Sequence, residues 1–134
     1  MRFLLCILLT ASAVLSCKKD NSDSSLLQRW QVDSLVEHSD SIARNAVNNI
    51  YIEFKSDKSI TLELEANTCG GSFSLSDSKN LSIEVQLCTE ACCDSDFSTR
   101  FTQLLSEIKS YHFVNNQLNL SGEENRSIRL LKAE

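Results

Sequence analysis

Alternating apolar and polar residues dominate the chain from Leu26 onward and predict β-strands. Each run puts apolar side chains on one face and charged or hydroxyl side chains on the other, as in a half-buried antiparallel sheet. The predicted strands cover residues 28–36, 50–54, 60–64, 73–75, 81–87, 111–114, 117–120 and 127–131. Residues 37–49 have no clean period, so we expect a long loop or a short helix there.

One segment has the period of a helix instead. Its apolar residues recur at i, i+4, i+7, i+8 and i+11, namely Phe97, Phe101, Leu104, Leu105 and Ile108. They share one helical face, and Asp94 or Ser95 is suited to cap the N-terminus. This face must pack against the sheet or close the end of a curled one. The pattern therefore predicts a single α+β domain with one helix.

The predicted turns contain no proline, because the whole chain has none. Residues 56–58 and 77–80 supply Asp, Asn, Ser and Lys, of which Asp and Asn tolerate the left-handed conformation. The two-residue link Asn115-Asn116 suits a tight hairpin.

The N-terminus has the pattern of an export signal. Arg2 precedes an apolar run over residues 3–14, which is too short to cross a bilayer. Val14-Leu15-Ser16-Cys17 resembles the bacterial lipobox. The resemblance implies cleavage after Ser16 and lipidation of Cys17, and two or three acyl chains make a durable anchor.

The expected organisation is therefore a lipoprotein signal peptide (1–16), a lipidated cysteine with a flexible polar tether (17–25) and a folded domain (26–134). Loss of residues 1–16 removes one arginine and no acid, so the formal charge changes from -5 to -6. The segment after Cys17 is similar to that of Bacteroidota lipoproteins displayed at the surface. We expect a location in the bacterial cell envelope, at the outer membrane, with surface and periplasmic orientation both open.

Charge and motifs exclude several function classes. The net negative charge disfavours nucleic acid, since a phosphate-binding face needs excess Lys and Arg. His38 and His112 lie far apart in the sequence, and no Gly-x-Ser-x-Gly nucleophile motif occurs. We expect no catalytic residues, no cofactor and no enzymatic activity.

The order of five short motifs resembles the META (HslJ-like) domain over residues 26–133. The motifs are Trp30-Gln31-Val32-Asp33-Ser34, Phe54 with the turn to Ile60, Asn67-Thr68-Cys69-Gly70-Gly71-Ser72-Phe73, Thr89-Glu90-Ala91-Cys92 and Leu118-Asn119-Leu120. The resemblance implies a curled antiparallel sheet, as a partly open barrel, with one helix packed against it. It also implies a bacterial envelope protein, and the family has no established catalytic residues.

Four cysteines remain once Cys6 leaves with the signal and Cys17 carries lipid: Cys69, Cys88, Cys92 and Cys93. An even number in an exported domain predicts two disulfides. The resemblance implies Cys69 paired with Cys92 or Cys93, whereas a hairpin of 73–75 with 81–85 would place Cys69 opposite Cys88. A four-thiolate zinc site and a reactive thiol are the alternatives, although we expect no metal. Gly70 and Gly71 are expected to supply the positive φ of a tight bend.

Two serines are candidate modification sites. Asp33-Ser34-Leu35 and Asp40-Ser41-Ile42 resemble the Asp-Ser/Thr-aliphatic O-glycosylation motif of Bacteroidota. Ser41 lies in the expected loop and is the better acceptor, because Ser34 overlaps a predicted strand.

These features together predict a monomeric, non-catalytic envelope lipoprotein for structural support or stress tolerance. Its partners would be the membrane, through the lipid on Cys17, and an envelope protein or a small apolar ligand. One alternative is a module that binds a small apolar or peptide ligand. The other is a thiol- or metal-dependent protein that uses the four cysteines.

Overall fold

The computed structural model describes residues 22–38, 42–77 and 79–134. Within these residues nine antiparallel strands form one curled sheet in the order β2-β1-β3-β4-β5-β6-β7-β8-β9, with β1 also paired to β9. The strands are β1 (Arg29–Val36), β2 (Arg44–Asn45), β3 (Tyr51–Phe54), β4 (Ser59–Glu63), β5 (Thr68–Ser76), β6 (Asn80–Cys88), β7 (Ile108–Val114), β8 (Gln117–Gly122) and β9 (Ser127–Lys132). The helices are α1 (Ser22–Leu26) and α2 (Asp96–Leu105).

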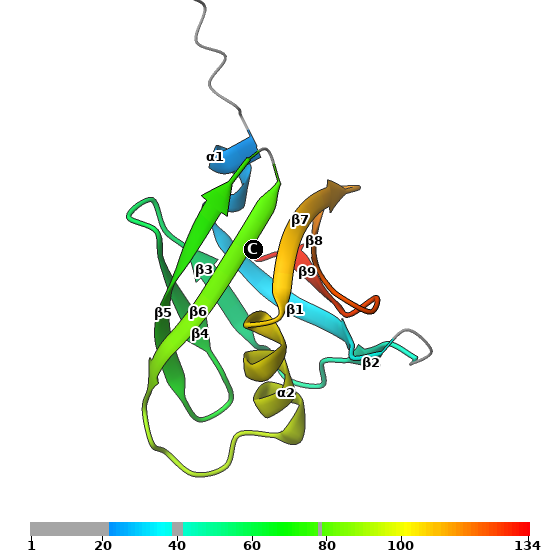
Figure 1. Ribbon diagram of the computed structural model, residues 1–134. Coiled ribbons are helices and arrows are strands. Elements are labelled where there is room, and N and C mark those ends of the chain that lie inside the picture. Colours follow the sequence, from blue (N-terminus) through cyan, green and yellow to red (C-terminus); the bar gives the residue numbers. More distant parts are fainter. Residues whose placement is uncertain (1–21, 39–41, 78) are drawn as a thin grey trace, which may run out of the picture.

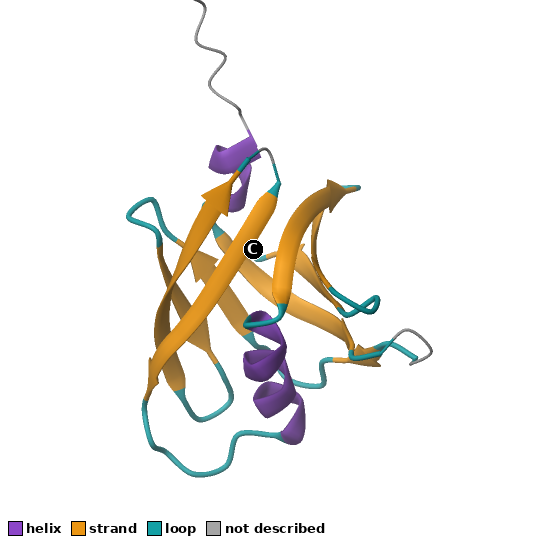
Figure 2. Ribbon diagram, in the orientation of Figure 1, coloured by secondary structure: helices purple, strands orange, loops and turns teal. Residues whose placement is uncertain are grey.

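The pairing of β1 with β9 curls the sheet into a barrel that is open along one seam. β6 and β7 pair only through Asn80 and Ser110, whereas β5 and β6 pair from Cys69–Cys88 to Ser76–Asn80. The chain between β6 and β7 forms α2, which packs beside β6 (Figures 1 and 2). Phe101 and Leu105 of α2 are fully buried. The expected α+β fold, a partly open barrel with a packed helix, is confirmed.

The interior of the barrel is filled by apolar side chains from every long strand. The largest fully buried ones are Trp30, Phe54, Phe101, Leu26, Leu35, Ile50, Ile52, Ile60, Leu62, Leu81, Leu105 and Ile108. Most of those on strands occupy alternate positions, as the period-2 pattern requires, while Leu26, Phe101 and Leu105 belong to the helices. The buried strand residues are thus those that the hydrophobic pattern predicted to form the core.

Antiparallel strands bring the connections to two ends of the barrel. The α1 end carries α1 and the β3–β4, β5–β6 and β7–β8 turns, and the α2 end carries α2, β2 and the β4–β5 and β8–β9 turns (Figure 1). Left-handed Asp and Asn residues occur at two of the turns as expected, with φ of 51° at Asp77, 50° at Asn115 and 63° at Asn116, whereas the turn at 56–58 uses Lys58, with φ of 68°, and not Asp57.

Two local predictions are wrong, and a third is confirmed only in part. Residues 22–25, expected in the flexible tether, form α1, because Leu26 is buried and the Trp30 indole Nε1 donates to its carbonyl at 3.1 Å. The described part of 37–49, expected as a long loop or a short helix, is mostly loop, but it contains the short edge strand β2, which pairs with Ser34 and Leu35 of β1. Ile108 begins β7 instead of ending α2.

The glycine prediction is also wrong, since neither Gly70 nor Gly71 has a positive φ. Both lie within β5, where the register with β6 shifts between them. A Cβ at Gly71 would lie 2.1 Å from the carbonyl oxygen of Glu84, while a Cβ at Gly70 would meet nothing within 4 Å. Gly71 is therefore required by the close approach of β6 and not by a turn.

Candidate functional site

A cleft of about 550 Å³ opens at the α1 end of the barrel, between α1 and the β7–β8 hairpin. Trp30 and Phe113 form its apolar part, and Gln28, Asn116 and Lys132 form its polar rim. These residues come from the start of β1, the tip of the hairpin and the end of β9. The pairing of β1 with β9 brings Trp30 opposite Lys132.

Aromatic side chains pack against one another at this cleft, and two of them, Trp30 and Phe113, line it. The ring centroids of Trp30 and Phe113 are 6.0 Å apart, and those of Tyr111 and Phe113 are 5.9 Å apart. Trp30 is 2% exposed and Phe113 is 37% exposed, so Phe113 is the ring that reaches solvent. An apolar surface bordered by amides and an ammonium suits a ligand or surface that is apolar with a polar or anionic edge.

A second ordered region lies at the α2 end, where Asn67 holds the segment that precedes α2. Its Oδ1 accepts hydrogen bonds from Thr89 Oγ1 and the Ala91 amide, both at 2.8 Å. Its Nδ2 donates to the Ala91 carbonyl at 2.8 Å and to Asp94 Oδ2 at 2.6 Å. Asp94 Oδ1 in turn accepts from the amides of Ala66 and Asn67, at 2.8 and 3.2 Å. This Asn67 clamp fixes the segment that carries Cys92 and Cys93.

The structure joins Cys69 to Cys88, which face each other in the register of β5 and β6 with Cα atoms 4.0 Å apart. The alternative that placed Cys69 opposite Cys88 is therefore the one observed. The pairing of Cys69 with Cys92 or Cys93 is wrong, and so is the second disulfide, because Cys92 and Cys93 are free and exposed. A four-thiolate zinc site cannot form while Cys69 and Cys88 are bridged.

The two free thiols are adjacent to each other. Cys93 has a φ of 91°, in the left-handed region. A hydrogen bond with Cys92, then burial and the nearby Asp94 carboxylate, raise the pKa of the Cys93 thiol. A raised pKa leaves less of the nucleophilic thiolate, so these contacts do not activate Cys93.

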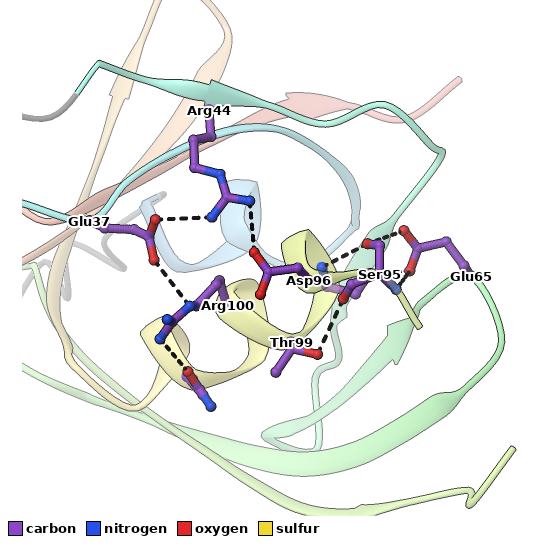
Figure 3. Close-up of polar contacts among 9 residues, drawn as sticks. Glu37, Arg44, Glu65, Ser95, Asp96, Thr99 and Arg100 are labelled. Carbon is purple, nitrogen blue, oxygen red and sulfur yellow. Dashed lines mark hydrogen bonds and ion pairs between the residues drawn. The ribbon is translucent and has the colours of Figure 1, made fainter. Parts of the chain in front are cut away.

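The N-terminus of α2 is capped as predicted, by Ser95, whose Oγ accepts from the Ser98 amide at 3.1 Å. The carboxylate of Glu65 accepts from the hydroxyl of Ser95 (Figure 3). It also accepts from the hydroxyl of Ser98 and from Asn48 Nδ2. Partial burial raises the pKa of Glu65, but these hydrogen bonds lower it by more, to about 2.

Charged side chains tie the same helix to β2 and to Glu37, which follows β1. Arg44 donates to Asp96 at 2.9 Å and to Glu37 at 3.1 Å, and Arg100 lies 3.6 Å from Glu37 (Figure 3). The hydrogen bonds from Arg44 to Asp96 and Glu37 raise the pKa of Arg44. These exposed pairs orient α2 at the open seam, and each adds little to stability.

The other residues singled out in the sequence lie apart. Ser34 is 4% exposed and its hydroxyl donates to Asp33 at 3.1 Å, so the folded domain does not present it to a modifying enzyme. His38 lines a small cavity at the α2 end, whereas His112 is exposed on β7. The signal peptide, Cys6, Cys17 and Ser41 lie outside the described residues.

The cleft at Trp30 is the feature that the sequence pattern missed. The alternating pattern predicts that Trp30 and Phe113 lie on strands. The pattern of neighbouring residues does not show that these two residues, 83 positions apart, line one cleft together with Lys132. In the described chain no three His, Cys, Asp or Glu side chains form a group able to hold a metal ion. Nor does any helix among the described residues have the length and apolar character to cross a membrane.

The structure is therefore a small, non-repetitive β-domain. It consists of one curled antiparallel sheet, with a helix at its open seam and the Asn67 clamp beside that helix. The family model of the META domain matches residues 24–134. The chain therefore belongs to the META domain family, as the five motifs indicated.

Solved structures support the fold. A protein from Burkholderia xenovorans, solved by NMR, has a TM-score of 0.66 at 16% identity and covers 96% of this chain and 99% of its own. A DUF4847 family protein from Bacteroides vulgatus has a TM-score of 0.63 at 14% identity and covers 84% of this chain and 96% of its own. A comparison with curated protein sequences gives no match.

Proposed function

We propose that this META domain protein is a lipid-anchored, non-catalytic module of the bacterial cell envelope. The observation that carries the proposal is the distance along the chain between the lipobox-like cysteine and the fold. The described domain begins with α1 at Ser22, five positions after Cys17. An extended chain of that length spans at most about 18 Å, so a lipid on Cys17 would hold the domain close to a membrane.

The barrel itself supports a role in contact with other molecules. Its interior is filled by packed side chains such as Phe54, Leu62 and Phe101, so ligands and partners must use its surface and the cleft at Trp30. We infer a role in structural support of the envelope or in stress tolerance, at the outer membrane.

Lipidation is tested by the intact mass of the full chain produced in a bacterial host. We expect wild-type protein in the membrane fraction, without residues 1–16 and with acyl groups on Cys17. Cys17→Ala should lose the lipid, while Cys6→Ala, the matched control within the apolar run, should keep it. An unmodified Cys17 in the wild type would contradict the proposal.

The envelope role is tested by deleting the gene and measuring survival in heat and detergent. We expect greater sensitivity, restored by the wild-type chain and not by Cys17→Ala. Equal survival of the deletion strain under both conditions would count against stress tolerance.

A second candidate function, binding of a small apolar or peptide ligand, is favoured by the cleft itself. Its apolar part is Trp30 and Phe113, and Lys132 offers a positive charge at the rim. β7 pairs with β6 only through Ser110, so the edge of β7 near Phe113 is available to an extended peptide.

This candidate is tested with anilinonaphthalene sulfonate, an aromatic anion that matches the cleft. We expect saturable binding that Phe113→Ala weakens and that the emission of Trp30 reports, since Trp30 is the only tryptophan. Leu87→Ala, which truncates a 79% exposed side chain on β6, is the control. Equal binding by both variants would exclude the cleft.

A further inference from the structure

We propose that the α1 end of the barrel lies against the membrane, with Phe113 and Val114 of the β7–β8 hairpin in the lipid surface. The proposal rests on the lipid anchor proposed above and adds an orientation and a contact surface. The partner is a bilayer with anionic headgroups.

The hairpin tip carries exposed apolar side chains that the fold does not cover. Val114 is 45% exposed and Phe113 is 37% exposed, directly before the Asn115-Asn116 turn. Side chains of this kind at the end of a hairpin gain free energy when they enter the interfacial region of a bilayer. An aromatic ring bordered by polar groups also suits that region.

The anchor enters the domain at the same end. α1 and Phe113 line opposite sides of the Trp30 cleft, and Figure 1 shows α1 and the tip of β7 at one end, with α2 at the other. The five positions from Cys17 to Ser22 cannot exceed about 18 Å when extended. An anchored chain therefore keeps the α1 end near the lipid and leaves the α2 end farther away.

The two ends of the barrel differ in charge, and the difference favours this orientation at an anionic membrane. α1, the connections and the strand ends at the α1 end carry Arg29, Lys55, Lys58, Lys79 and Lys132 with Asp23, Asp57, Asp77 and Glu134. The described connections and α2 at the other end carry Arg44, Arg100 and Arg126 with Glu37, Glu65, Glu90, Asp94, Asp96, Glu107, Glu123 and Glu124.

The α2 end is thus strongly acidic, and the α1 end has slightly more basic than acidic residues. An anionic surface repels the acidic end, and surface charges act over about 8–10 Å at physiological salt. Lysines at the α1 end can keep their ammonium groups among the headgroups while Phe113 and Val114 enter the lipid. Tether length, apolar tip and charge all favour the same orientation.

Trp30 makes this contact measurable, because it is the only tryptophan and its ring lies 6.0 Å from Phe113. The full lipidated chain is reconstituted in phosphatidylethanolamine–phosphatidylglycerol vesicles whose acyl chains carry bromine near the headgroup. Trp30 emission is compared with that in unbrominated vesicles. We expect brominated lipid to quench Trp30.

The variant Phe113→Ser/Val114→Ser should lose at least half of this quenching. The matched control is Ile42→Ser/Val47→Ser, which changes the 91% and 92% exposed side chains beside β2 at the α2 end. The control should be quenched as strongly as the wild type. Val114→Ser alone should also lower the quenching. Because this change lies outside the core, the single variant provides the test if the double variant does not fold.

Each outcome decides the matter. Equal emission of the wild type in both kinds of vesicle would overturn the proposal, and so would equal quenching of wild type and Val114→Ser. The mass of the same sample separates the two proposals. Protein without lipid on Cys17 refutes the anchor and with it the orientation, whereas lipidated but unquenched protein refutes only the orientation.

Discussion

Asn67 and Asp94 bind each other through their side chains at 2.6 Å, and this contact joins the β4–β5 turn to the segment that leads into α2. Asn67 uses both its amide nitrogen and its amide oxygen here, so one side chain satisfies two backbone groups of Ala91 as well. The helix that covers the open seam is thereby connected to the sheet across 27 positions of sequence.

Replacing Asn67 with Ala should therefore destabilise the domain by about 1–3 kcal/mol, because several partners lose a hydrogen bond at once. The measurement is urea unfolding followed by Trp30 emission. Asn48→Ala is the control, since Asn48 gives a single 3.3 Å hydrogen bond to Glu65 and should cost well under half as much. Equal losses of unfolding free energy in the two variants would show that the several hydrogen bonds of Asn67 stabilise the domain no more than the single hydrogen bond of Asn48.

Glu65 should make stability depend on acid. Its hydrogen bonds with Ser95, Ser98 and Asn48 outweigh the effect of burial and hold its pKa at about 2, against 4.5 for an ordinary glutamate. A carboxylate with a depressed pKa in the folded state stabilises the fold above the unfolded pKa and loses this contribution as the pH falls toward the folded pKa. The wild type should thus lose stability between pH 4.5 and about 2.

The substitution Glu65→Gln should remove that part of the pH dependence. The pH dependence is measured as the difference in unfolding free energy between pH 6 and about pH 3. This difference should be smaller for the variant than for the wild type. Glu90→Gln, an exposed change in the segment before α2, should retain the wild-type difference. A full wild-type slope in Glu65→Gln would contradict the assignment.

Gly71 and Gly70 offer a matched pair of adjacent substitutions. Gly71→Ala should cost about 1–3 kcal/mol, because its Cβ would overlap a backbone oxygen and force β5 away from β6. That Cβ would lie 2.1 Å from the Glu84 carbonyl, whereas Gly70→Ala meets open space and should change stability little. Thermal unfolding of both variants measures the contrast. Similar midpoints would show that the two strands separate freely.

The strands and their turns could be predicted because their signals are local. Alternation fixes the face that each strand buries, and asparagine and aspartate mark the left-handed turns at Asp77 and Asn115. Ser95 precedes a run with helical period and caps α2. Each of these features depends on neighbours within a few positions, so one sequence contains the needed information.

Features made by distant strands could not be predicted in the same way. Whether Gly71 serves a turn or a close contact depends on where Glu84 lies in the next strand. The cleft needs the pairing of β1 with β9 before Trp30, Phe113 and Lys132 come together. β2 has two residues, too few to show any period.

The disulfide shows both situations in one feature. The facing positions of Cys69 and Cys88 follow from a hairpin whose strands were predicted, so local reasoning found the pair. The resemblance implied Cys92 or Cys93 as the partner, but this chain carries its cysteine two residues after Asn67, within β5. That position faces β6 and not the segment before α2.

Removing this bridge should destabilise the domain by about 3 kcal/mol, as expected for a closed loop of this size. The bridge encloses a separation of 19 residues and ties the end of β6 to β5. Cys69→Ala/Cys88→Ala should therefore unfold at lower urea, while Cys92→Ser/Cys93→Ser, which changes exposed free thiols, should unfold like the wild type. Alkylation before reduction, followed by peptide mass mapping, should label Cys92 and Cys93 and leave Cys69 and Cys88 unlabelled. Reductant should lower the stability of the wild type and of the Cys92/Cys93 variant alike. Labelling of Cys69 in the untreated protein, or a stability that reductant does not change, would contradict the pairing.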